Sequence, residues 1–178
     1  RWKLLEQGLL TRQQVKESRY EILFAELGVD YSAAEATAYY EDQLSQKGFV
    51  FPDTIKLLET LHGRYRMYIV SNGGSNVQSG RLADSGIGKY FEDIFISEDA
   101  GAEKPSREFF DYCFGRRPEI KADETVIIGD SLTSDIQGGI NAGIRTIWFN
   151  PDGQHAADIH PDYEVKTLME IPALLEEM

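Results

Sequence analysis

Several features are scarce in this sequence of 178 residues, and each scarcity excludes a class of protein. Cysteine occurs once, as Cys113, so the chain cannot form an internal disulfide, which is typical of proteins in a reducing compartment. No stretch approaches the roughly 18 consecutive apolar residues that a membrane helix needs. We therefore predict a cytoplasmic protein that does not act at a membrane.

Basic residues are also few. Lys and Arg number 18 and Asp and Glu number 30, which gives a formal net charge of −12 at pH 7. Such a negative field repels the backbone of DNA and RNA, so we expect no nucleic acid polymer as a partner. Apolar residues make up 42% of the chain, an ordinary share for a globular fold. The sequence leaves the oligomeric state open, and a homo-oligomer is one alternative.

The pattern of apolar residues divides the chain into two parts. In residues 1–48 it is helical, and two spacings typical of N-terminal capping boxes occur there, Thr11 with Gln14 and Ser32 with Glu35. Short amphipathic helices without strand partners bury little surface alone, so we predict a small helical cap over residues 1–48. The sequence does not begin with Met, and we expect it to be part of a longer protein.

Residues 49–178 instead alternate strands and helices. Continuous apolar runs such as Met67–Val70 and Val126–Gly129 suit strands that helices cover on both faces. The alternation predicts an α/β core with a doubly wound parallel sheet over residues 49–178. The expected strands are 66–70, 93–97, 125–129, 145–149 and 163–165, and the expected helices are 53–62, 76–85, 106–116, 133–141 and 167–177.

Candidate functional residues follow the predicted strands, because ligands of open α/β sheets bind beyond the carboxyl ends of the strands. Taken singly, each has a plain structural interpretation: a turn, a surface lysine, a helix cap, a charge in a first helical turn. Taken together, a hydroxyl, a lysine and two carboxylates suit a phosphoryl group with Mg²⁺. These residues are Ser71, Asn72 and Gly73 after one strand, Lys104 before a helix, and Asp130 and Asp135 after another strand.

Three stretches of this set resemble motifs of the haloacid dehalogenase (HAD) superfamily of hydrolases. The resemblance covers roughly residues 49–165, and the helical first part is similar to the small mobile cap of that family. Within its phosphatase branch, the arrangement is similar to bacterial pyrimidine 5′-nucleotidase-like members. The stretches, in the order of the family's second to fourth motifs, are Ile69-Val-Ser-Asn-Gly, Glu103-Lys-Pro and Ile127-Ile-Gly-Asp-Ser-Leu-Thr-Ser-Asp-Ile.

The resemblance implies a role for each residue. Asp130 would bind Mg²⁺, and Asp135 would contact the metal through water or orient Lys104. The implied reaction is Mg²⁺-dependent hydrolysis of a phosphomonoester through an aspartyl phosphate. The substrate would be a small phosphorylated metabolite, such as a nucleoside monophosphate. The catalytic residues would be Ser71 and Lys104, and the substrate-binding residues would be Ser71, Asn72, Gly73 and Lys104.

The first motif of the family, Asp-x-Asp, occurs nowhere in this sequence. In the family it supplies the nucleophile, and its strand lies between the strands found here at 66–70 and 125–129. Without that strand, these two would stand about 10 Å apart, with unpaired backbone between them. We therefore expect the 178 residues alone to have little or no phosphatase activity, and we favour a missing N-terminal segment over a degenerate enzyme as the reason.

Two other functions stay open at this point. A 2-haloacid dehalogenase would share the fold and the Ser71-Asn72-Gly73 turn, and it would need no Mg²⁺. A non-catalytic regulatory or binding protein would have kept the fold and lost the nucleophile. Two weaker signals receive structural interpretations: Cys113, beside Phe109 on a predicted helix, is expected to pack in the core, and His155 and His160 are expected in a polar surface loop rather than a metal site.

Overall fold

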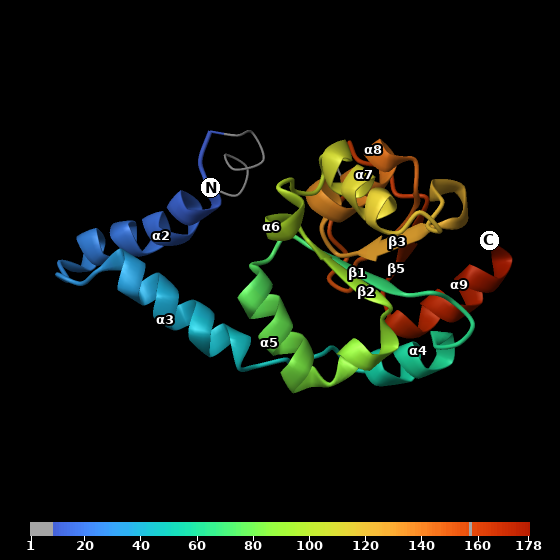
Figure 1. Ribbon diagram of the computed structural model, residues 1–178, viewed down its shortest axis with the longest axis horizontal. Helices are drawn as coiled ribbons and strands as arrows, with labels where there is room; N and C mark the ends of the chain where they lie inside the picture. The colour runs from blue at the N-terminus through green and yellow to red at the C-terminus, as the bar shows by residue number, and fades with distance from the viewer. Residues whose placement is uncertain (1–8, 157) are drawn as a thin grey trace. The chain divides into compact units, whose positions relative to one another are not determined.

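The chain divides into two compact units, a helical unit and a core unit. The structure, a computed structural model, describes residues 9–156 and 158–178 (Figure 1). The helical unit ends at Phe49 and also contains Asn76–Ser85, and the core unit contains Val50–Ser75 and Gly86–Met178. The first eight residues of the predicted helical segment lie outside the described residues. The assignment of the helical unit as a cap stays a prediction.

The helix α2 (Arg12–Leu27) begins where the spacing of Thr11 and Gln14 indicates. The capping box predicted at its start is confirmed: the Thr11 side chain accepts a hydrogen bond from the backbone of Gln14, and the Gln14 side chain accepts one from the backbone of Thr11. Gly28 ends the helix with a left-handed φ of 64°, a conformation that favours glycine. Local side-chain chemistry therefore defines this helix.

The helices α3 (Ala33–Ser45) and α5 (Ser75–Ser85) approach each other closely. A Cβ atom at Gly80 would lie 2.3 Å from the carbonyl oxygen of Ser45, so only glycine permits this contact. At the start of α3, Ser32 accepts a hydrogen bond from the amide of Glu35, which is one half of the predicted capping box. The helical unit is thus held by close backbone packing as well as by its caps.

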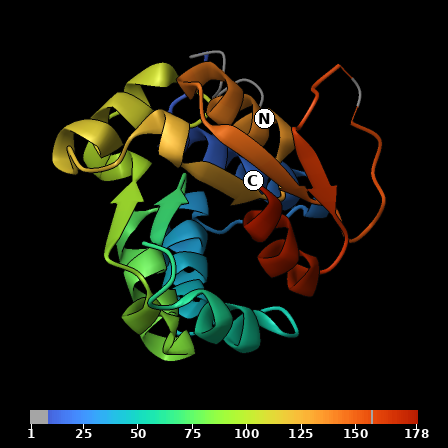
Figure 2. The ribbon, with the colours of Figure 1, turned by 90° about the vertical axis from the view of Figure 1, so that its right-hand side faces the viewer.

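Parallel strands form the centre of the core unit, as predicted, and each lies within two residues of its expected position. They fall into two sheets, however, one of two strands and one of three (Figure 2). The strands are β1 (Tyr68–Ser71) and β2 (Asp93–Ile96) in the first sheet, and β3 (Val126–Gly129), β4 (Arg145–Phe149) and β5 (Tyr163–Val165) in the second.

No ladder joins β1 to β3 among the residues that the structure describes. Ile128, in the middle of β3, is 37% exposed, although a central strand of a doubly wound sheet would bury it. The break falls between strands 66–70 and 125–129, where the resemblance places a further strand. The α/β fold with parallel strands is therefore present, but as two sheets instead of one continuous sheet.

Helices cover both faces of these strands, which confirms the doubly wound arrangement (Figure 1). On one side, α7 (Arg107–Arg116) and α8 (Gln137–Ala142) cover an apolar cluster that includes Phe109. On the other, α4 (Thr54–Leu61) and α9 (Ile171–Glu177) cover a second cluster. Each fully buried large side chain stabilises the fold by about 1.5–3 kcal/mol. Shorter elements are η1 (Ile87–Tyr90), α6 (Ser97–Ala100), η2 (Ala122–Glu124), η3 (Leu132–Ile136) and η4 (Leu168–Glu170).

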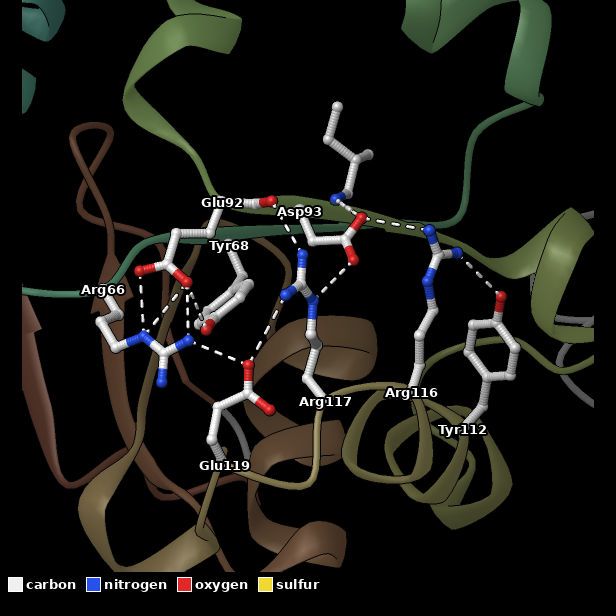
Figure 3. A network of polar contacts seen from close by, with 9 residues as sticks. Arg66, Tyr68, Glu92, Asp93, Tyr112, Arg116, Arg117 and Glu119 are labelled. Atoms are coloured by element: carbon white, nitrogen blue, oxygen red, sulfur yellow. Dashed lines mark hydrogen bonds and ion pairs between the residues drawn. The ribbon is translucent and has the colours of Figure 1, made fainter.

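Arginines and carboxylates connect the starts of β1 and β2 to the end of α7 (Figure 3). Asp93, the first residue of β2, accepts a hydrogen bond from Arg116 at 3.2 Å on one oxygen and from Arg117 at 2.9 Å on the other. Burial alone would raise the pKa of Asp93, but the Ile94 amide and the two arginines outweigh it and hold the pKa below its usual value. The network thus favours the ionised carboxylate. The other side chains in it are Arg66, Tyr68, Glu92, Tyr112 and Glu119.

We expect Asp93→Asn to lower the melting temperature at pH 7 by roughly 3–8 °C, because charge-assisted hydrogen bonds are lost. A carboxyl group whose pKa is lowered by folding stabilises the protein above its unfolded pKa, and this contribution disappears as the pH falls through the folded pKa. The difference between wild type and variant should therefore shrink below about pH 4. Thermal melts at pH 7 and at low pH measure it.

The matched control is Asp111→Asn, whose ion pair with Arg107 lies on the exposed surface of α7. Exposed ion pairs contribute little to the free energy of unfolding, so this variant should have the melting temperature of the wild type at both pH values. An Asp93→Asn difference that stays the same at low pH would contradict the role assigned to the ionised carboxylate.

Candidate active site

The buried ion pair between Lys104 and Asp135 forms the centre of the candidate site. The ammonium nitrogen of Lys104 lies 2.6 Å from Oδ1 of Asp135 and 2.9 Å from the carbonyl oxygen of Val70, near the end of β1. Lys104 is only 6% exposed and Asp135 only 8%. A lysine so far from water is not an ordinary surface lysine, and the pair brings together three segments that are distant in the sequence.

Asp135 is positioned by an unusual turn after β3. The predicted helix 133–141 begins as a π-helical turn, η3, before it continues as α8. In this turn the carbonyl of Ser131 accepts from the amides of both Asp135 and Ile136, and Oδ2 of Asp135 accepts from the amide of Ser131 at 3.1 Å. One carboxylate oxygen thus orients the turn while the other holds Lys104. Single π-helical turns of this kind are frequent at functional sites.

Gly129, the last residue of β3, is required for this arrangement. A Cβ atom there would lie 2.4 Å from the Cβ, Cγ and Oδ2 atoms of Asp135, which is much closer than real contacts allow. The sequence showed Gly129 only as part of a motif, and the close approach that requires glycine becomes visible in three dimensions. Glycine therefore permits the carboxylate to lie directly against the strand.

Two further predicted site residues keep part of their bonding capacity unused. The Ser71 hydroxyl oxygen accepts a hydrogen bond from the amide of Gly73 at 3.1 Å, and among the described residues its own proton has no acceptor. The Asp130 carboxylate is exposed, and within residues 9–156 and 158–178 it has no hydrogen-bond or ion-pair partner. Both groups are therefore able to contact a ligand.

Trp148 positions the backbone of Asp130, a role that sequence reasoning missed. Its indole N–H donates to the carbonyl oxygen of Asp130 at 3.0 Å, and the side chain is 1% exposed. A tryptophan in a predicted buried strand is ordinarily interpreted as core packing, so the sequence carried no signal for this contact. The remaining predicted residue, Asn72, contacts the backbone of Lys104 and the hydroxyl of Ser134.

The side chains of the candidate site can supply one free carboxylate to a hard divalent cation. Among the described residues, no three or more His, Cys, Asp or Glu side chains are grouped so that they could hold a metal ion. His155 and His160 therefore belong to no such group within that part of the chain. Asp130 offers one uncommitted carboxylate, whereas Asp135 is engaged by Lys104 and Ser131. Mg²⁺ commonly takes one or two carboxylates and completes its shell with substrate oxygens and water, so Asp130 suits it.

Two other features lie apart from this site. Cys113 is 3% exposed within the core, and burial raises the pKa of its thiol to about 12, so it is a neutral packing group at pH 7. A hollow of about 280 Å³ lies at the opposite, N-terminal ends of β1 and β2 and contains none of the predicted site residues. The hollow is lined by His62, Gly63, Arg64, Tyr65, Arg66, Met67, Tyr90 and Glu92.

Among the described helices, none has both the length and the apolar character needed to cross a membrane.

The fold and this set of residues define a hydrolase of one large family. The sequence profile of haloacid dehalogenase-like hydrolases matches residues 8–149. The chain therefore belongs to the haloacid dehalogenase-like hydrolase family, and the resemblance noted in its motifs is confirmed.

Among curated proteins, the chain is 40% identical over 175 residues to the HAD-hydrolase YfnB of Bacillus subtilis, with 98% of this chain and 74% of YfnB covered. It is 35% identical over 178 residues to the pyrimidine 5′-nucleotidase PynA of Streptococcus pneumoniae, with 99% and 75% covered. The chain is thus a HAD-type hydrolase related to pyrimidine 5′-nucleotidases.

Solved structures agree with this relationship. A crystal structure of YfnB bound to magnesium superposes with a TM-score of 0.92, at 40% identity, and covers 98% of this chain and 77% of that protein. A 2-haloacid dehalogenase from Pseudomonas syringae pv. Tomato DC3000 superposes with a TM-score of 0.72, at 28% identity, and covers 98% and 77%. Members of the fold with different activities are therefore among its relatives.

Proposed function

We propose that the protein hydrolyses phosphomonoesters of a small metabolite with the help of Mg²⁺, and that a nucleoside monophosphate is the first substrate to test. The observation that carries this proposal is the buried Lys104–Asp135 pair at the ends of β1 and β3. Two of the three ammonium protons of Lys104 have acceptors in the described chain, Asp135 and Val70. The third is available for a phosphoryl oxygen.

Each residue of the proposed site has a defined task. Lys104 and the Ser71 hydroxyl would donate hydrogen bonds to phosphoryl oxygens, and such charge-assisted bonds strengthen as charge develops in the transition state. Asp135 would keep the ammonium group of Lys104 in place. Asp130 would hold Mg²⁺, which, when bound, would neutralise part of the phosphate charge and orient that group.

The aspartyl-phosphate step in this proposal needs a nucleophilic Asp-x-Asp, and none of the 178 residues supplies one. The activity is therefore best measured on the full product of the gene, with the 178-residue chain beside it. The net charge of −12 does not oppose an anionic substrate, because Lys104, and Mg²⁺ when bound, would set the local field at the site.

A substrate panel tests the proposal. It contains p-nitrophenyl phosphate, pyrimidine and purine nucleoside monophosphates and 2-chloropropionate, each with Mg²⁺ and with EDTA. We expect Mg²⁺-dependent phosphate release, with the highest kcat/KM for a nucleoside monophosphate, and its loss in EDTA. Chloride release that survives EDTA would instead support a 2-haloacid dehalogenase. No turnover of any compound by the full product would support the non-catalytic alternative.

In the same assay, Asp130→Asn should lower kcat/KM about 100-fold or more, because the neutral amide is a poor Mg²⁺ ligand and removes a charge from the site. Asp123→Asn is the matched control, since Asp123 is an exposed carboxylate on the short turn η2. Its kcat/KM should equal that of the wild type. Near-normal turnover of Asp130→Asn would overturn the assignment of the metal ligand.

A further inference from the structure

The carboxamide of Asn72, at the end of β1, has all its main bonding groups engaged by the protein itself. Its Nδ2 group donates to the carbonyl of Lys104 at 2.8 Å and to the hydroxyl of Ser134 at 3.2 Å. Its Oδ1 atom accepts from the amide of Lys104 at 2.9 Å. Both N–H bonds are therefore committed, and this use differs from the direct substrate contact predicted for Asn72.

The two bonds to Lys104 hold both of its backbone polar groups, the N–H and the carbonyl. This pairing of a donor and an acceptor resembles the way a neighbouring strand holds a residue in a ladder. With its backbone fixed, Lys104 extends its ammonium group to Val70 and Asp135. The backbone constraint thus fixes the point from which the side chain extends to these two acceptors.

The third bond connects the same carboxamide to the turn η3, which carries Asp135. β1 and β3 share no ladder among the described residues, so backbone pairing does not set the position of one against the other there. The contact between Asn72 and Ser134 crosses that break at the edge where the site lies. One side chain therefore links the three segments that carry Ser71, Lys104 and Asp135.

We propose that Asn72 is a positioning residue that fixes the ammonium group of Lys104 in the site by holding the Lys104 peptide and the η3 turn together. Its consequence for turnover rests on the proposed phosphatase function, whereas its effect on Lys104 does not. Without these bonds, the segment around Lys104 would move away from β1 and the ammonium group would become accessible to water.

The test uses Asn72→Asp, which keeps the shape and the oxygen that accepts from Lys104 but removes both N–H donors. The 178-residue protein is treated with an amine-reactive ester at fixed pH, and acylation of Lys104 is followed by mass spectrometry. Local opening exposes protected groups, so we expect Lys104 to react about tenfold faster in the variant. Lys121, whose side chain is 61% exposed, is the internal reference and should react at an unchanged rate.

The matched control is Asn141→Asp. The Asn141 carboxamide donates to the carbonyl of Pro105, the residue after Lys104, but from the exposed surface of α8. The same substitution there should leave the acylation rate of Lys104 unchanged. If both variants accelerate Lys104 equally, loosening of this segment in general explains the result and the specific role of Asn72 is overturned.

Kinetics of the full product of the gene provide the second measurement. We expect kcat of Asn72→Asp to fall about 10–100-fold, as is typical when a partner that orients an active group is lost, while KM changes about threefold or less. Asn72→Ser, which shortens the side chain without adding charge, should show the same split. Its acylation rate also decides the question if Asn72→Asp does not fold.

Unchanged acylation of Lys104 in a folded variant would overturn the proposal. A change in KM with an unchanged kcat would overturn it too, since that pattern indicates direct substrate binding. Should the substrate panel find no phosphatase activity while Lys104 reacts faster in the variant, the positioning role stands and the proposed function fails. The two proposals therefore fail by different results.

Discussion

Replacing Asp135 with alanine is expected to lower the free energy of unfolding by about 3–5 kcal/mol. The substitution removes the ion-pair partner of the Lys104 ammonium group. Lys104 is only 6% exposed, so water cannot replace that partner easily. The substitution also removes the acceptor for the amide of Ser131. Urea denaturation of the 178-residue chain measures the loss, and the full product of the gene should lose nearly all turnover.

A double variant separates the missing charge partner from the lost packing. Lys104→Met combined with Asp135→Ala removes both charges, so it should lose less stability than the sum of the two single variants. As a control, Asp111→Ala breaks an exposed pair with Arg107 and should cost at most about 0.5 kcal/mol. Strictly additive losses, or a loss below about 1 kcal/mol for Asp135→Ala, would contradict the view that this pair is buried and coupled.

Gly129→Ala is the second substitution from which we expect a large effect. The added Cβ atom would meet three atoms of the Asp135 side chain at 2.4 Å, and the carboxylate would have to move away from both Lys104 and the Ser131 amide. Overpacking of this kind costs about 1–3 kcal/mol. A displacement near 1 Å in a catalytic group costs about 100-fold in rate, so turnover of the full product should fall by that factor.

Gly115→Ala is the matched control for this substitution. Gly115 lies in α7, and a Cβ atom there would have nothing within 4 Å. Alanine is the better helix residue, so the control should be stabilised by about 0.5–1 kcal/mol. Wild-type stability and turnover in Gly129→Ala would show that Asp135 accommodates the methyl group and that the close packing against β3 is dispensable.

The positions of the elements could be predicted from the sequence because their signals are local. Apolar runs mark strands such as β3, and the reciprocal spacing of Thr11 and Gln14 marks the start of α2. The break between the two sheets was also foreseeable, since a whole motif is absent from the sequence. The π-helical turn was not, because the residues that form it are equally compatible with an ordinary first helical turn.

The bonding partners of the site residues were the part that the sequence could not indicate. Asn72 lies 32 residues from Lys104 and 62 from Ser134, and Trp148 lies 18 from Asp130. Which of several available groups a side-chain amide or an indole N–H contacts is decided by how the segments pack together. Motif reasoning therefore located segments that meet at the ends of β1 and β3, but it did not indicate which protein groups their side chains contact.

The break between β1 and β3 also bears on the behaviour of the isolated chain in solution. Strand edges that have no ladder partner among the described residues are templates onto which strands of other molecules can add, and the exposed Ile128 lies on one of these strands, β3. A net charge of −12 keeps identical molecules apart through mutual repulsion, and dissolved salt weakens that repulsion. The colloidal stability of the chain is therefore expected to depend on ionic strength, with dilute buffers keeping it dispersed and concentrated salt favouring self-association.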